Sequence, residues 1–236
     1  FYAFWAAARL ADARMYDPDS LEALQRSQCP DVSDKRFIRP AFQALALAPL
    51  GNLSFISAYA VWFSLNVAAC LGLLYLCGFQ AAHILAAALY IPLMWSFGLG
   101  QDAPLIMLWF VAGAALLKKG KAWSGGALLA PCMVKPAIFF LVPLVLAARK
   151  QYRALASMSV TGAVLCCAAI PAAGWDWPAR FAHAALANEA LISPNILGMA
   201  GLIRWLGQPD WLRVPLAAVG AGLTLIWTRR LNLDAA

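Results

Sequence analysis

Long apolar runs separated by short polar turns fill the chain beyond residue 52. Crossing a hydrocarbon core of about 30 Å takes about 20 residues of helix, and several runs have that length. We therefore expect a polytopic all-α integral membrane protein, with one domain over residues 1–236 and its membrane part over 53–230. The runs cover residues 53–77, 82–99, 103–117, 122–148, 154–173, 195–206 and 214–228, of which the third and sixth are short for a full crossing.

Residues 1–52 form the only long stretch with soluble character, and we expect an extracytoplasmic or interfacial segment there. Phe1, Trp5 and Ala8 recur at helical spacing, which predicts a short helix lying at the bilayer surface. The sequence Tyr16-Asp17-Pro18 would end that helix or turn the chain. Because the chain begins at Phe1 rather than Met, we interpret it as a fragment that lacks its N-terminal part.

Two basic clusters set the expected topology. Residues 118–121 contain three lysines, and residues 149–153 contain two arginines and a lysine. Positively charged loops face the cytoplasm, so both clusters are predicted on that side. The run 122–148 then begins and ends on one side, and Lys135-Pro136 interrupts it. Because proline breaks a helix, we expect a broken hairpin of two short helices, about 122–134 and 137–148.

The same topology predicts that four polar features share the extracytoplasmic face. They are residues 1–52, the Gly100-Gln101-Asp102 turn, the Lys135-Pro136 tip and a loop over 174–213. Trp175 and Trp177 in that loop fit an interfacial aromatic belt. Most of the polar turns are therefore expected on one side of the membrane.

Composition narrows the function classes. Hydrophobic residues make up 63% of the chain and charged residues 12%, well below the charged share of soluble domains. The net charge of +7 would suit nucleic acid, but the basic residues lie in short clusters between apolar runs. We therefore expect the lipid bilayer as a partner and no nucleic acid. No metal-ligand, nucleophile-elbow or phosphate-loop spacing occurs, so we expect no metal site and no cofactor.

Lys135 is the most informative single residue, because a lysine among apolar residues at membrane depth is costly without a partner or a purpose. One interpretation is a side chain that snorkels to the interface. The other is a contact to an anionic group, in the first place phosphate. Asp102 could offset the charge of Lys135 if the two turns meet, since opposite charges stabilise each other strongly away from water.

Other polar residues also allow a functional and a structural interpretation. The Gly100-Gln101-Asp102 turn supplies an amide and a carboxylate at the lipid boundary, or it is a connecting turn in which Asp102 caps a helix. Arg39, before Pro40, would lie near the interface and either bind phosphate or snorkel. His183 and Asn195 have no metal-ligand or triad spacing around them.

The order of short motifs is similar to that of a known family. The chain contains, in order, Phe1-Tyr2-Ala3-Phe4-Trp5-Ala6-Ala7-Ala8-Arg9-Leu10, Tyr16-Asp17-Pro18, Arg39-Pro40, Gly100-Gln101, Lys135-Pro136 and Ser193-Pro194-Asn195. This order resembles glycosyltransferase family 87, mannosyltransferase-like membrane proteins that use polyprenol-phosphate sugars and have the GT-C helical fold. In the family an aspartate that is taken as the catalytic base usually precedes the first motif, so the resemblance places the base just upstream of Phe1. The family commonly has Gly-Gln-Asn where this chain has Asp102, and Tyr-Pro-Pro where it has Arg39-Pro40.

The resemblance implies a hexosyltransferase that moves a sugar such as mannose from a polyprenyl-phosphate donor to a glycan or glycolipid acceptor. The enzyme would be a multi-pass protein of a bacterial inner membrane with its active site on the extracytoplasmic side. Lys135, with Arg39 as the second choice, would bind the donor phosphate, while Gln101, Asp102 and Asn195 would bind the substrate. A transporter or flippase of a lipid-linked saccharide is the main alternative, and a scaffold without catalysis is another.

Overall fold

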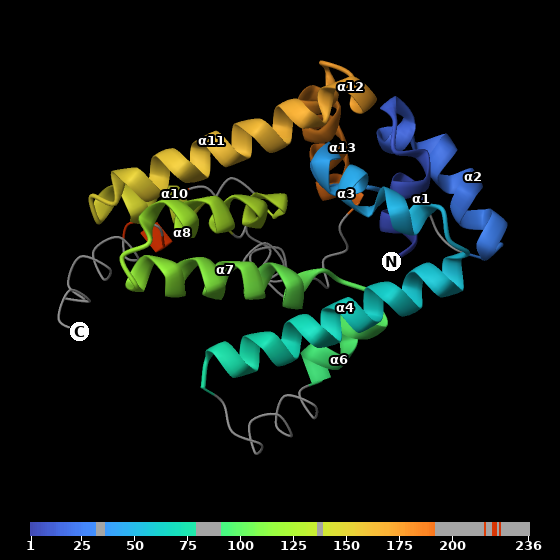
Figure 1. Ribbon diagram of the computed structural model, residues 1–236. Coiled ribbons are helices and arrows are strands. Elements are labelled where there is room, and N and C mark those ends of the chain that lie inside the picture. Colours follow the sequence, from blue (N-terminus) through green and yellow to red (C-terminus); the bar gives the residue numbers. More distant parts are fainter. Residues whose placement is uncertain are drawn as a thin grey trace.

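The computed structural model describes residues 1–31, 36–78, 91–135 and 139–191 together with positions 215, 219, 220 and 222. All regular elements in these described parts are helices, so the expected all-α class is confirmed (Figure 1). The expected runs 195–206 and most of 214–228 lie outside the described residues. In chain order the elements are α1 (Tyr2–Leu10), η1 (Ala13–Tyr16), α2 (Pro18–Gln28), α3 (Ala41–Gly51), α4 (Phe55–Leu76), α6 (Ile91–Gly98), α7 (Ala103–Lys118), α8 (Ala122–Leu129), η2 (Ala130–Val134), α10 (Leu141–Ala148), α11 (Tyr152–Ala168), α12 (Ile170–Ala173) and α13 (Trp177–Leu191).

Helix α1 forms where the sequence predicts a helix, but it lies inside the protein. Its residues from Phe4 to Ala8 are buried, and Trp5 is only 2% exposed. Gly51 of α3 lies so close that a Cβ atom there would come within 2.5 Å of the Arg9 backbone nitrogen. The position of the helix at the bilayer surface stays a prediction, while its packing against protein is a new finding. Its three consecutive alanines leave room for α3 to pack against it.

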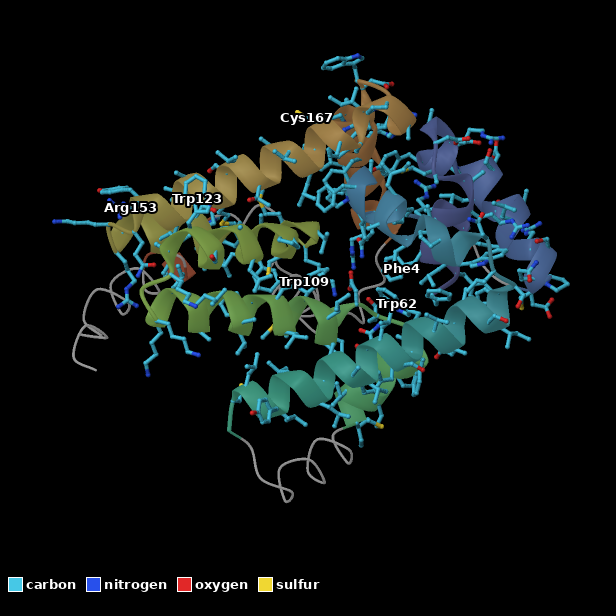
Figure 2. The ribbon with its side chains drawn as sticks, in the orientation of Figure 1. Phe4, Trp62, Trp109, Trp123, Arg153 and Cys167 are labelled. Atoms are coloured by element: carbon cyan, nitrogen blue, oxygen red, sulfur yellow. The ribbon has the colours of Figure 1, made fainter. Side chains whose placement is uncertain are left out.

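A core of buried aromatic and small apolar side chains joins α1 to α4 and α13. Phe4 and Trp62 lie close together in this core, with their ring centroids 5.9 Å apart (Figure 2). Trp177 is buried in the same core, so its expected place in an interfacial belt is wrong, whereas Trp175 is 83% exposed. The first part of the expected 174–213 loop is helix α13, because its alanine-rich sequence favours a helix.

Four helices stack in the order α4, α7, α8 and α11 (Figure 1). Glycine allows the closest of these contacts: a Cβ atom on Gly126 of α8 would overlap the Ala154 carbonyl of α11. Within the described residues, α4 and the stretch Tyr152–Ala173 are long and apolar enough to cross a membrane. Large apolar side chains on these helices, including Ile56 and Val164, are exposed, as a lipid-facing surface requires.

The expected span over residues 82–99 is described from residue 91 onward, where α6 begins. The broken run over 122–148 is described as α8 and η2, then Lys135, and then residues 139–148 with α10. Helix α8 and η2 together lead from the 118–121 turn to Lys135. Lys135 therefore lies where a run of helix stops.

The turns at residues 118–121 and 149–153 lie at one end of the stack, which we call the basic end. The Ser157 hydroxyl donates a 2.6 Å hydrogen bond to the Trp123 carbonyl, which ties the helices that follow the two turns to each other. Figure 2 shows Trp123 and Arg153 at this end, away from Phe4 and Trp62. In each turn one residue is in the left-handed region, Gly120 with φ 73° and Lys150 with φ 57°.

Candidate functional site

A buried carboxylate organises the polar residues at the opposite end of the stack. The Asp102 side chain is 1% exposed and lies in the turn before α7. Its Oδ1 atom is 2.7 Å from Lys135 Nζ, and its Oδ2 atom is 3.4 Å from Arg39 Nε. Gln43 Nε2 also donates to Oδ2, at 3.0 Å. We call these four residues the Asp102 cluster.

Three separate segments of the chain supply the cluster. Lys135 follows the last residue of η2, and Arg39 precedes Pro40 at the start of α3. Gln43 lies in the first turn of α3, and Asp102 is the residue before α7. Segments about 60 residues apart in sequence therefore meet at one carboxylate, as the Arg39 and Gln43 contacts to Asp102 show.

The chain around Arg39 is held by its neighbours. The Tyr16 hydroxyl donates a 2.7 Å hydrogen bond to the Arg39 carbonyl. The Arg39 guanidinium carbon lies 5.7 Å from the centre of the Phe4 ring, within the range of a cation–π contact. Its Nη1 atom donates to the Ile38 carbonyl at 3.3 Å. Backbone, ring and carboxylate thus fix the guanidinium from several sides.

The turn that carries Asp102 requires glycine at position 100. Gly100 has a φ of 63°, and a Cβ atom there would lie 2.6 Å from Phe1 Cβ. Its carbonyl accepts a 2.9 Å hydrogen bond from Trp62 Nε1. The Gln101 backbone N–H donates to the Ser96 carbonyl at 2.8 Å. These contacts define the backbone from which the Asp102 side chain extends.

The interpretation of Asp102 as a simple helix cap is wrong. Asp102 occupies the N-cap position of α7, but its side chain makes no capping hydrogen bond there. The carboxylate instead contacts Lys135, Arg39 and Gln43. Two cations and an amide offer a buried carboxylate stronger contacts than a helix N-terminus does.

The charges around Asp102 keep the carboxylate ionised. Burial by itself raises the pKa of Asp102, but the nearby charges of Arg39 and Lys135 and the hydrogen bonds from Lys135 and Gln43 bring it below its ordinary value. One negative charge then faces two positive charges, so the Asp102 cluster carries a net charge of about +1. The cluster is therefore suited to one further negative charge.

The two cations are better placed than Asp102 to meet a ligand. The side chains of Lys135 and Arg39 are 14% and 13% exposed, against 1% for Asp102. Among the described residues, the hydrogen bonds of Arg39 involve Nε and Nη1 and leave Nη2 available. Lys135 has three N–H donors and directs one short contact at Asp102. Donors for an anion therefore remain on both residues.

The structure brings together three of the five site residues expected from the sequence, namely Lys135, Arg39 and Asp102. Gln101 adjoins Asp102 and is partly exposed, but its side chain is not one of the contacts of the carboxylate. Asn195 lies outside the described residues. His183 lies exposed on α13, away from the contacts of the cluster.

Gln43 is the cluster member that the sequence analysis missed. The available signal was an amide inside the otherwise apolar stretch of α3. A buried amide needs a partner, and here the partner is the Asp102 carboxylate. No metal-binding group of three or more His, Cys, Asp or Glu residues occurs among the described residues.

The fold and cluster define a helical protein with membrane-length helices and a buried, net positive site. The sequence profile of glycosyltransferase family 87 matches residues 37–236, which include all four residues of the Asp102 cluster. The chain belongs to glycosyltransferase family 87, and the expected resemblance is confirmed. Family membership and the two apolar helices indicate a glycosyltransferase that is a membrane protein. Comparisons with curated proteins and with solved structures gave no significant match.

Proposed function

We propose that this glycosyltransferase moves a hexose such as mannose from a polyprenyl-phosphate donor to a glycan or glycolipid acceptor. The observation that carries the proposal is the pair of cations, Lys135 and Arg39, around one buried carboxylate. A phosphodiester linking a sugar to a lipid carries one negative charge, which matches the net charge of about +1 in the cluster. The apolar helices beside the site suit a donor with a lipid tail.

In the proposed reaction, the acceptor hydroxyl attacks the anomeric carbon of the sugar. The bond from that carbon to the phosphate oxygen breaks, and the polyprenyl phosphate leaves with the bonding electrons. The acceptor proton passes to a base, for which the resemblance implies an aspartate upstream of Phe1. Lys135 and Arg39 stabilise the charge that develops on the departing phosphate, because fixed cations in a water-poor site act strongly on such charge.

We also propose that the site faces the extracytoplasmic side of a bacterial inner membrane. The two basic turns lie at the basic end, away from the Asp102 cluster, and basic turns favour the cytoplasm. Gln101, next to Asp102 in the turn, and Asn195 are proposed contacts for the sugar hydroxyls. The substrate-binding role expected for Asp102 becomes an indirect one, because its side chain is enclosed by cluster partners.

The proposal is tested by transfer of a radiolabelled sugar from a polyprenyl-phosphate donor in reconstituted vesicles. We expect Lys135→Ala to reduce turnover by about 100-fold or more, the range seen when one donor to a developing oxyanion is removed. Lys119→Ala, which removes an exposed lysine at the basic end, is the matched control and should leave turnover unchanged.

Near-normal turnover of Lys135→Ala would remove Lys135 from the site. Movement of a lipid-linked saccharide across the vesicle membrane without sugar transfer would instead support the transporter hypothesis. Both measurements use the same vesicles, so the two hypotheses are separated in a single preparation.

A further inference from the structure

We infer that Asp102 sets the net charge of the phosphate site and thereby controls how readily the spent lipid phosphate leaves. The inference rests on the proposed function, since it names a property of the same site. Asp102 would be a positioning residue rather than a catalytic one, because its 1% exposed side chain acts through Lys135 and Arg39.

The first step of the argument concerns the charge of the lipid before and after transfer. The donor is a phosphodiester with one negative charge. The product is a phosphate monoester, which carries between one and two negative charges at neutral pH because its second pKa is about 6. A site with two cations and no carboxylate would favour the product over the donor. With ionised Asp102 present, the net charge of about +1 is matched to the donor instead.

The second step concerns the two cations, which Asp102 holds unequally. Lys135 Nζ lies 2.7 Å from the carboxylate, whereas Arg39 Nε lies 3.4 Å from it. The Asp102 Oδ2 atom that faces Arg39 also accepts the Gln43 hydrogen bond at 3.0 Å. Lys135 is therefore the more firmly paired cation, and Arg39 is the one whose Nη2 atom is left for a phosphate among the described contacts. Gln43 keeps Oδ2 in place beside the Arg39 guanidinium.

The third step is the residue type itself. Burial is costly for a charge, but the contacts with Lys135 and Arg39 offset that cost, so Asp102 remains charged in place. Asparagine could still accept from Lys135 and bond to Gln43. What asparagine cannot do is subtract one charge from the site. The charge of Asp102 is therefore the property that the position supplies.

The experiment measures dissociation constants of a polyprenyl monophosphate and of its methyl diester for the purified protein in lipid nanodiscs at pH 7.5. We expect Asp102→Asn to bind the monophosphate about tenfold more tightly than wild type, with a smaller gain for the diester, because one added positive charge acts most on the ligand with more negative charge. In the transfer assay, the same variant should show a lower kcat and stronger inhibition by the monophosphate.

Two substitutions at Gln43 separate charge from hydrogen bonding and protect the test if Asp102→Asn does not fold. Gln43→Lys adds a positive charge while keeping Asp102, so it should shift the ratio of the two dissociation constants in the same direction as Asp102→Asn. Gln43→Met has a similar size and removes the hydrogen bond without changing charge, so its ratio should stay at the wild-type value.

An unchanged ratio in both charge-raising variants would overturn the inference, as would an equal shift in Gln43→Met. Failure of the proposed function has a different result. Wild-type protein could transfer no sugar while Asp102→Asn and Gln43→Lys still tighten monophosphate binding. In that case the inference that Asp102 sets the net charge of the site holds, and the proposed enzymatic function does not.

Discussion

The basic residues at the two ends of the helical stack differ in burial and in pairing. In the Asp102 cluster, Lys135 and Arg39 share a buried carboxylate and have little exposed surface. At the basic end, the six basic residues of the two turns lie mostly exposed, and the sequence has no acidic residue from 103 through 175. The first arrangement fixes the cations around a carboxylate, whereas the second leaves them exposed and without an acidic neighbour in sequence. Exposure and pairing, rather than the number of basic residues, therefore distinguish a candidate site from a topological signal.

The largest expected effect is on thiol labelling, because the two ends should react from opposite sides of the membrane. In a cysteine-free background, Trp175→Cys should react with a membrane-impermeant thiol reagent from outside the cell. Lys119→Cys should react only after the inner face is opened, because basic turns stay in the cytoplasm. Both positions are exposed, so access depends on the side alone. The opposite labelling pattern would overturn the proposed orientation and with it the extracytoplasmic site.

The next effect is on stability. Replacing Asp102 by leucine leaves two cations without their carboxylate, and breaking a buried ion pair in this way costs about 3–5 kcal/mol. Lys119→Leu, at an exposed position of the basic end, should change the free energy of unfolding by less than about 0.5 kcal/mol. Unfolding in mixed micelles measures both. Equal stability of the two variants would show that the Asp102 cluster does not hold its end of the protein together.

The smallest effect concerns the support of Arg39. Tyr16→Phe removes the 2.7 Å hydrogen bond to the Arg39 carbonyl, at a cost of about 1 kcal/mol. We expect a rise of the donor KM by a few-fold, with kcat nearly unchanged. Tyr59→Phe loses a comparable bond to the Phe97 carbonyl, without touching Arg39, and serves as the control. A similar KM change in both variants would mean that the effect is general loosening.

Much of the helical framework could be predicted from the sequence because long apolar runs leave few alternatives. The 22-residue helix α4 lies within the predicted run 53–77, and α7 covers nearly the same residues as the predicted run 103–117. Lys135 could be singled out because it is a charge that interrupts an apolar run, and Asp102 because it lies in a polar turn between two apolar runs. For Lys135, the cost of placing a charge in lipid is the signal.

The contacts that cross the chain could not be predicted in the same way. The sequence gives no sign that Gln43 would meet Asp102, which lies 59 residues away. The burial of Trp177 and of α1 likewise depends on which neighbours pack against them, because an aromatic or alanine-rich surface suits lipid and protein equally well. The hydrophobic pattern thus predicts which helices form, while tertiary contacts determine which neighbours each helix packs against.

The left-handed backbone conformation of Lys150 lowers the stability of the protein. Gly120 occupies the matching position of the other basic turn, where the conformation costs a glycine nothing, whereas lysine is strained there by about 1 kcal/mol. The two turns have the same backbone closure, with hydrogen bonds of 2.9 Å from Lys121 to Leu116 and from Gln151 to Leu146. Glycine would therefore fit position 150 with a gain in folding free energy. Lysine at that position instead adds one more positive charge to the basic end.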